Sequence, residues 1–113
     1  MNDLEQILQK IKQFSDQRDW HKFHNNKDLA IAIAIEAAEL NELFLWKTPQ
    51  QSDQDFDKQQ LADELADILT YAFMMAHKNQ LDIKTIILDK LQKNAKKYPV
   101  EKSRGNAKKY TEL

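Results

Sequence analysis

The sequence predicts an all-α protein organised as a four-helix bundle, and three observations support this. The chain of 113 residues contains one glycine and two prolines, so few residues interrupt long helices. Apolar residues recur at helical spacing in four separate segments. Hydrophobic residues make up 42% and charged residues 31% of the chain, which is ordinary for a globular protein. We therefore expect one domain over residues 1–113.

The first predicted helix covers residues 3–19, where large apolar side chains recur every three or four positions. Residues 20–26 form an aromatic and polar connector. The second helix is predicted over residues 27–46 and ends before a Thr-Pro pair, because the position preceding a proline disfavours helix. Its alternating Ala-Ile sequence does not indicate a strand, since both residue types are apolar. A polar loop is expected over residues 50–55.

The third helix is predicted over residues 57–79 and carries one apolar stripe. The fourth is predicted over residues 82–98, with Asp82 as its N-cap and Pro99 as its stop. Residues 100–113 are expected to form an extended tail. The second helix is apolar on nearly all sides, so we expect it to be central or to contact a partner subunit as well.

Composition excludes several classes of function. The chain has no cysteine, so disulfides, thiolate metal sites and cysteine nucleophiles are ruled out. The longest apolar run, residues 29–35, is far shorter than the roughly 20 residues of a membrane span. No basic and apolar leader is evident at the N-terminus, so a cytoplasmic location is expected. The net charge of −1 argues against a general nucleic-acid-binding protein.

The charges are distributed unevenly along the chain. Residues 1–77 contain 7 Lys+Arg and 14 Asp+Glu, whereas residues 78–113 contain 10 and 4. An acidic part that holds metal and a basic part that holds phosphate would suit a nucleotide site. The two parts would equally well attract each other, and composition leaves both interpretations open.

Two pairs of carboxylates are the most informative feature of the sequence. Glu36-Ala-Ala-Glu39 interrupts an apolar run, and Glu64-Leu-Ala-Asp67 lies on the third predicted helix. At i,i+3 spacing the two members of a pair lie about 60° apart on one helix face. Unpaired carboxylates are costly to bury, so a cation should compensate them. If the two helices pack antiparallel, the pairs face each other and predict a divalent-metal site.

The residue types favour a hard metal ion. Oxygen ligands alone are typical of Mg²⁺ or Mn²⁺ rather than iron or zinc. A di-iron bundle would require Glu-x-x-His on two helices, and no histidine follows a candidate glutamate at that spacing. Asp63 points further from the apolar stripe than Glu64, so we expect it outside the metal's ligands. Carboxylate pairs at i,i+3 spacing are also common on solvated helix faces, where they bind no metal. That alternative stays open beside the metal site.

The motifs resemble those of the MazG-like superfamily of all-α nucleoside triphosphate pyrophosphohydrolases, most closely its dCTP pyrophosphatase branch. The resemblance covers the chain from about residue 14 onward. Besides the two carboxylate pairs, the matching stretches are Arg18-Asp19-Trp20, Phe44-x-Trp46-Lys47, Lys97-Tyr98-Pro99 and the C-terminal Lys109-Tyr-Thr-Glu-Leu113.

The resemblance implies hydrolysis of a (d)NTP to the monophosphate and pyrophosphate, with dCTP or modified dCTP as the expected substrates. It implies Mg²⁺, for which Mn²⁺ is a possible substitute, held by Glu36, Glu39, Glu64 and Asp67. These four are also the expected catalytic residues. A non-ligand oxygen of Glu36 or Glu39 is our expected general base. Such an enzyme would serve nucleotide-pool sanitation.

The resemblance also assigns binding roles. Aromatic residues would form the base pocket, a role that falls to Trp20 and Trp46 with His24 and Tyr71 as polar neighbours. The expected phosphate-binding residues are Lys90, Asn94, Lys97 and Arg104. The family implies a homotetramer built as a dimer of dimers, or a homodimer, with sites completed across subunits.

Alternatives remain at this stage. A non-catalytic helical interaction module would use the carboxylates in interhelical salt bridges. A dUTPase or a phosphoribosyl-ATP pyrophosphohydrolase would belong to the same superfamily. The short connection between the second and third helices and Ile11, where some relatives carry a polar residue, put substrate preference in doubt.

Overall fold

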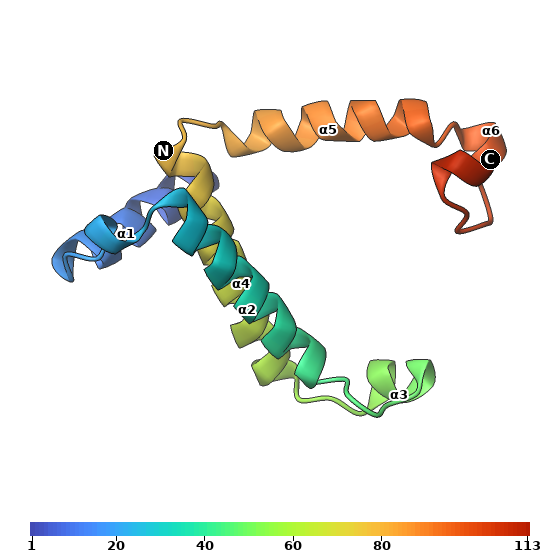
Figure 1. Ribbon diagram of the computed structural model, residues 1–113, viewed down its shortest axis with the longest axis horizontal. Helices are drawn as coiled ribbons and strands as arrows, with labels where there is room; N and C mark the ends of the chain where they lie inside the picture. Colours follow the sequence, from blue (N-terminus) through green and yellow to red (C-terminus); the bar gives the residue numbers. More distant parts are fainter. The chain divides into compact units, whose positions relative to one another are not determined.

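The computed structural model describes residues 1–113 and contains helices and turns but no strand, so the all-α prediction is confirmed (Figure 1). All four long helices that the sequence predicts are present. The chain divides into two compact units, Met1–Gln80 and Leu81–Leu113. None of the helices is both long enough and apolar enough to cross a membrane.

The first unit is built on three long helices and two short ones. In chain order they are α1 (Asp3–Gln17), the 3₁₀ turn η1 (His21–Phe23), α2 (Asn26–Glu42), α3 (Pro49–Gln54) and α4 (Lys58–Lys78).

Helices α2 and α4 lie side by side and run in opposite directions (Figure 1). Two reciprocal hydrogen bonds join the start of α2 to the end of α4. The Asn26 amide donates to Asn79 Oδ1 at 3.1 Å, and the Asn79 amide donates to Asn26 Oδ1 at 2.8 Å. This antiparallel pairing is the arrangement that allows the two carboxylate pairs to face each other.

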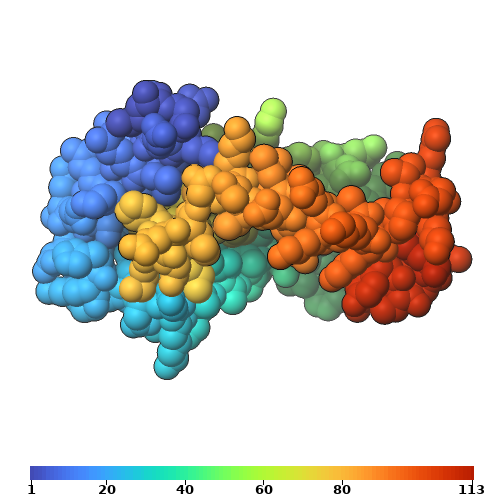
Figure 2. Space-filling model, turned by 90° about the horizontal axis from the view of Figure 1, so that it is seen from above, coloured from blue at the N-terminus to red at the C-terminus, as the bar shows by residue number.

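Helix α1 packs against α4, and the small core of this unit lies near that contact. Figure 2 shows the blue atoms of α1 beside the gold atoms at the end of α4. Leu29 is 1% exposed, and Ala76 and Ser15 are also buried. The start of α2, the end of α4 and the end of α1 therefore meet at one end of the helix pair.

The structure corrects two predicted boundaries around the α2–α4 connection. Helix α2 ends at Glu42 and is followed by turns, so the prediction that it continues to Trp46 is wrong. The polar loop predicted over residues 50–55 is instead the short helix α3. Thr48 and Gln51 form a capping box, and Pro49 occupies the first turn, where its missing N–H is no loss. Pro49 therefore begins helix α3.

The second unit contains α5 (Ile83–Lys97), α6 (Val100–Ser103) and the 3₁₀ turn η2 (Tyr110–Glu112). Asp82 is the N-cap of α5, as predicted, and accepts hydrogen bonds from the Thr85 N–H and hydroxyl at 3.0 and 2.7 Å. The tail after residue 99 was expected to be extended, which is wrong for α6 and η2. Tyr110 folds back onto Tyr98, with ring centroids 6.0 Å apart in an edge-to-face arrangement.

Candidate metal centre

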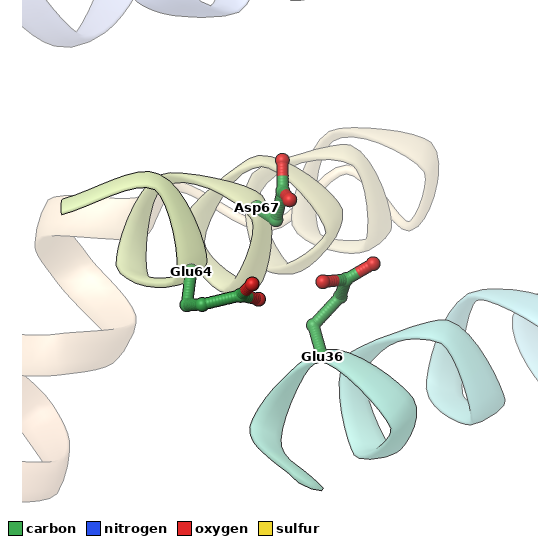
Figure 3. Close-up of side chains that lie close together, drawn as sticks. All are labelled: Glu36, Glu64 and Asp67. Atoms are coloured by element: carbon green, nitrogen blue, oxygen red, sulfur yellow. The ribbon is translucent and has the colours of Figure 1, made fainter. Parts of the chain in front are cut away.

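Three of the four predicted carboxylates come together between α2 and α4. One oxygen from each of Glu36, Glu64 and Asp67 lies within 4.8 Å of the others. Figure 3 shows Glu36 reaching from α2 toward Glu64 and Asp67 on α4. We call these three residues the carboxylate cluster. It forms because each helix presents its acidic residues toward the antiparallel partner.

The cluster holds negative charge with nothing in the chain to neutralise it. Glu36 Oε2 and Glu64 Oε2 are buried and have no hydrogen-bond partner. None of the chain's ion pairs involves a cluster residue. Buried carboxylates without partners are costly when ionised. The arrangement is therefore incomplete unless protons or a cation occupy it.

The electrostatics disfavour ionisation of two cluster carboxyls, Glu36 and Glu64. Burial raises the pKa of Glu36 to about 7, with further contributions from Glu39, Asp67 and Glu64. Burial likewise raises the pKa of Glu64, and the neighbouring Glu39 and Asp67 carboxylates act in the same direction. Like charges that share a site cannot all ionise at their ordinary pKa. Burial is the largest contribution to the raised pKa of both carboxyls, and the neighbouring carboxylates add to it.

Glu39 lies beside the cluster rather than within it. It adds to the raised pKa of both Glu36 and Glu64, so it is close to both. Together with Glu42, Gln60 and Glu64, it lines an open depression of about 450 Å³. Asp63 lines the same depression, but it is exposed, accepts a hydrogen bond from the Gln59 amide at 2.8 Å and contributes no oxygen to the cluster.

The donor set fits a hard divalent cation. All of the converging ligand atoms are carboxylate oxygens, which suit Mg²⁺ and Mn²⁺. The two buried oxygens without partners would gain the partner they lack from such an ion. Glu39 contributes no oxygen to this group of three, and its role as a fourth ligand stays a prediction.

An aromatic pocket adjoins the cluster. Three of the four predicted base-binding residues approach one another. Trp20 and His24 lie 6.4 Å apart between ring centroids, as do His24 and Tyr71. These rings line a pocket of about 450 Å³ that Asp67 also lines. Asp67 therefore belongs to the carboxylate cluster and to the wall of the aromatic pocket.

Trp46 lies outside this pocket. It is 92% exposed and follows the end of α2, whereas Trp20 precedes its start. Helix α2 has 17 residues, which corresponds to a length of roughly 25 Å. The backbone of Trp46 has a φ of 65°, a left-handed conformation that few bulky residues adopt. Trp20 and Trp46 of one chain do not line the same pocket.

The four predicted phosphate-binding residues all belong to the second unit. Lys90, Asn94 and Lys97 lie on α5, and Arg104 follows α6. Lys90, Lys97 and Arg104 are exposed, whereas Asn94 is partly buried. Lys97 Nζ lies 4.8 Å from the centroid of the Tyr110 ring, a cation–π contact. The role of these residues in binding phosphate stays a prediction.

The structure adds four pocket residues that the sequence did not single out, Lys10, Phe14, Thr70 and Met74. Phe14 contacts Trp20 edge to face, with ring centroids 5.7 Å apart. Its i,i+4 spacing to Arg18 could have indicated a functional pair. No comparable signal marks Lys10 or Thr70, which enter the pocket only because α1 packs on α4.

Comparison with known proteins agrees with this geometry. Residues 31–113 match the sequence profile of the MazG-like family. The chain belongs to the MazG-like family. The matched range of this MazG-like protein includes both carboxylate pairs, while Trp20 and His24 lie before it.

Individual relatives extend the match. The chain is 37% identical to dCTP pyrophosphatase 1 of Rattus norvegicus, over 97% of this chain and 67% of the rat protein. It is 38% identical to dCTP pyrophosphatase 1 of Bos taurus, over 97% of this chain and 68% of the bovine protein. The crystal structure of a pyrophosphatase from Archaeoglobus fulgidus matches with a TM-score of 0.83 and 31% identity. That match covers 88% of this chain and 94% of the archaeal one.

Proposed function

We propose that this MazG-like protein is a Mg²⁺-dependent nucleoside triphosphate pyrophosphohydrolase that cleaves a (d)NTP to the monophosphate and pyrophosphate. Its preferred substrates are dCTP or modified dCTP, and its role is nucleotide-pool sanitation. The carboxylate cluster, with two buried oxygens that lack partners, is the observation that carries this proposal. Relatives named dCTP pyrophosphatase 1 support the substrate class.

Glu36, Glu39, Glu64 and Asp67 hold the metal in this proposal, with Glu36 provided by α2 and Glu64 and Asp67 by α4. When bound, Mg²⁺ polarises phosphate oxygens and lowers the pKa of bound water. Because α2 and α4 are regular helices joined by the Asn26–Asn79 hydrogen bonds, the carboxylates are held in place before substrate arrives.

The aromatic pocket binds the base. Trp20 offers an indole surface on which a base can stack, and His24 and Tyr71 offer polar groups at its edge. Asp67 lines the pocket and also belongs to the cluster, so a nucleotide base in the pocket lies next to the metal ligands. Stacking tolerates different bases, and the polar groups set the preference among them.

Phosphate binding falls to Lys90, Asn94, Lys97 and Arg104. Lys90, Asn94 and Lys97 follow an i, i+4, i+7 pattern on α5 and share one helix face. Exposed lysines meet phosphate as flexible point charges, whereas an arginine offers two parallel donors. The positively charged side chains among them balance the negative charge of the triphosphate, which the carboxylates cannot do.

We further propose that the protein works as a homotetramer built from dimers, or as a homodimer. Only three apolar residues, Leu29, Ala76 and Ile83, are buried in the single chain. Exposed apolar side chains on α5 include Ile87 and Leu91, at 52% and 57%. If Trp20 and Trp46 both contact a base, they must come from different copies, because α2 separates them within one chain.

A non-catalytic interaction module is the competing function. In that alternative the carboxylates would make interhelical salt bridges, but no ion pair in the chain includes Glu36, Glu64 or Asp67. The observation favours the enzyme. A dUTPase or phosphoribosyl-ATP pyrophosphohydrolase activity remains an outcome of the substrate test below.

The test is a pyrophosphate-release assay over the canonical NTPs and dNTPs and 5-methyl-dCTP, in Mg²⁺ and in EDTA. We expect metal-dependent release of pyrophosphate with the monophosphate as co-product, fastest for dCTP or its modified form. Glu36→Gln should abolish it, and Asp63→Asn, which changes an exposed carboxylate one position from Glu64, should not.

Three results would contradict the proposal. Release of orthophosphate would place the cleavage at a different phosphorus. Fastest turnover of dUTP would move the protein to another activity of the superfamily. No turnover of any nucleotide, with no thermal shift on adding Mg²⁺, would leave the interaction module as the better explanation.

A further inference from the structure

The position of Trp20 is set by the way in which α1 ends. The Trp20 N–H donates to Ser15 O at 3.1 Å and the Asp19 N–H donates to Asp16 O at 3.1 Å. These two bonds define a Schellman motif, in which the residue that follows the helix C-cap adopts a left-handed conformation. Asp19 fills that position with a φ of 55°. The motif reverses the chain and returns Trp20 to the side of α1.

Arg18 stands at the centre of this turn and contacts the aromatic residues. Its guanidinium carbon lies 3.7 Å from the centroid of the Phe14 ring and 6.0 Å from that of the Trp20 ring. Its Nη1 donates to Phe14 O at 3.0 Å, which fixes the plane of the guanidinium. Phe14 and Trp20 in turn meet edge to face at 5.7 Å. The three side chains form one packed group.

Arg18 does not line the aromatic pocket, whereas Phe14 and Trp20 both do. A guanidinium stacked on an aromatic face is bound by the ring's quadrupole and also covers apolar surface. The Trp20 ring is half-exposed, at 41%, and besides Phe14 and Arg18 it meets His24 edge to face. Arg18 therefore acts on the pocket through the two rings.

We propose that Arg18 is a positioning residue for substrate, which locks Phe14 and Trp20 in the orientation that receives the base. This inference rests on the proposed function of the pocket. Because the rings contact the base equally in the bound substrate and in the transition state, loosening them weakens binding without slowing the chemical step. The predicted signature is a change in KM with an unchanged kcat.

The test compares Arg18→Gln with wild type in steady-state kinetics on dCTP with Mg²⁺. We expect KM to rise about fivefold, as for loss of one cation–π contact, and kcat to stay within about twofold. Arg18→Lys keeps the charge but loses the planar stack, so its KM should be intermediate. Lys22→Gln is the matched control, because Lys22 pairs with Asp19 of the same turn at 2.8 Å but makes its cation–π contact with Phe23, at 5.4 Å, rather than with Phe14 or Trp20.

A second measurement follows Trp20 directly. Acrylamide quenching of tryptophan fluorescence should increase in Arg18→Gln and not in Lys22→Gln. Trp46, at 92% exposure, adds a constant background to each variant. If the wild type turns over no nucleotide, the proposed function fails, and the quenching result still decides whether Arg18 holds Trp20.

The inference is overturned if Arg18→Gln leaves both KM and quenching unchanged. It is also overturned if kcat falls while KM stays constant, since Arg18 would then act on the chemistry. If Arg18→Gln does not fold, Arg18→Lys takes its place, and a wild-type KM with wild-type quenching in that variant contradicts the proposal.

Discussion

Two charged regions of the molecule differ in how far solvent reaches them. One is the carboxylate cluster of the first unit, and the other is the lysine-bearing face of α5 in the second unit. Glu36 and Glu64 are partly buried and each has one oxygen that is removed from water and lacks a partner. Lys90 and Lys97 are exposed. Burial makes the ionised cluster costly unless protons or a cation compensate it, while solvent screens the charges of the exposed lysines.

The largest expected effect is on the buried side of this comparison. Glu36→Gln should lower pyrophosphate release at least about a hundredfold, because it removes a metal ligand. The same change should raise the Tm of the metal-free protein at about pH 8, since it removes a carboxylate that is costly to ionise. Activity and differential scanning calorimetry measure the two effects.

Asp63→Asn is the control for that variant and should change neither quantity. A metal-free Tm that falls in Glu36→Gln would show that the carboxylate is compensated in the folded protein. The contrast between buried and exposed charge would then be lost.

The second prediction concerns pH. Between pH 4.5 and about 7 the folded protein keeps a proton on Glu36 that the unfolded chain has released. The metal-free protein therefore loses stability as the pH rises through this window. Mg²⁺ needs ionised ligands, so its thermal shift should be small at about pH 5.5 and large at about pH 8.

At a concentration of about 100 times its Kd, Mg²⁺ would add about 2.7 kcal/mol to stability. Thermal melts with Mg²⁺ and with EDTA at several pH values measure this effect. A Mg²⁺ shift that does not depend on pH would contradict the raised pKa of Glu36.

The third prediction tests the exposed side. Lys97→Met should raise KM for the triphosphate about tenfold through the loss of one phosphate contact, with Tm changed by less than about 2 °C. Lys96→Met, on the same helix but off the Lys90–Lys97 face, is the control. Kinetics at low and high salt provide the measurement, since an exposed contact weakens as salt rises. An equal KM in both variants would remove Lys97 from the site.

The smallest expected effect concerns the contribution of the α5 N-cap to thermal stability. Asp82→Ala removes the N-cap and should lower Tm by about 3–6 °C at neutral pH. Hydrogen bonds from Thr85 hold the pKa of Asp82 below its usual value of 3.8. Its contribution is therefore present above pH 3.8 and lost as the pH falls further. Melts at neutral and acid pH check this, and a difference that persists in acid would contradict it.

Sequence reasoning succeeded where the cause is local. The capping carboxylate of Asp82 and the apolar periodicity located the long helices, because caps and periodicity act within a few residues. It failed at Thr48-Pro49, which predicts the end of a helix, whereas Thr48 caps α3 and Pro49 begins it. It also missed the turns that end α2 at Glu42, since Leu43–Trp46 continue the apolar composition of the helix.

The candidate site likewise contains residues that the sequence identified and residues that only the structure revealed. Glu36, Glu64 and Asp67 were found from i,i+3 spacing and from their place in or beside apolar stripes. Lys10 and Thr70 entered the aromatic pocket without a sequence signal, because a pocket between α1 and α4 depends on how two distant segments pack. Trp20 and Trp46 look equivalent in the sequence, and the length of α2 separates them.

The sequence by itself determined the helical class, the helix caps and the carboxylates available on each helix face, because these depend on local backbone preferences and residue spacing. Only the tertiary structure decided which carboxylates meet, that ionised Glu36 and Glu64 are disfavoured, and that Arg18 stacks on the Phe14 ring of the aromatic pocket. Those properties depend on distance and desolvation across antiparallel helices and at the reversal of α1, and neither quantity is encoded in any single segment.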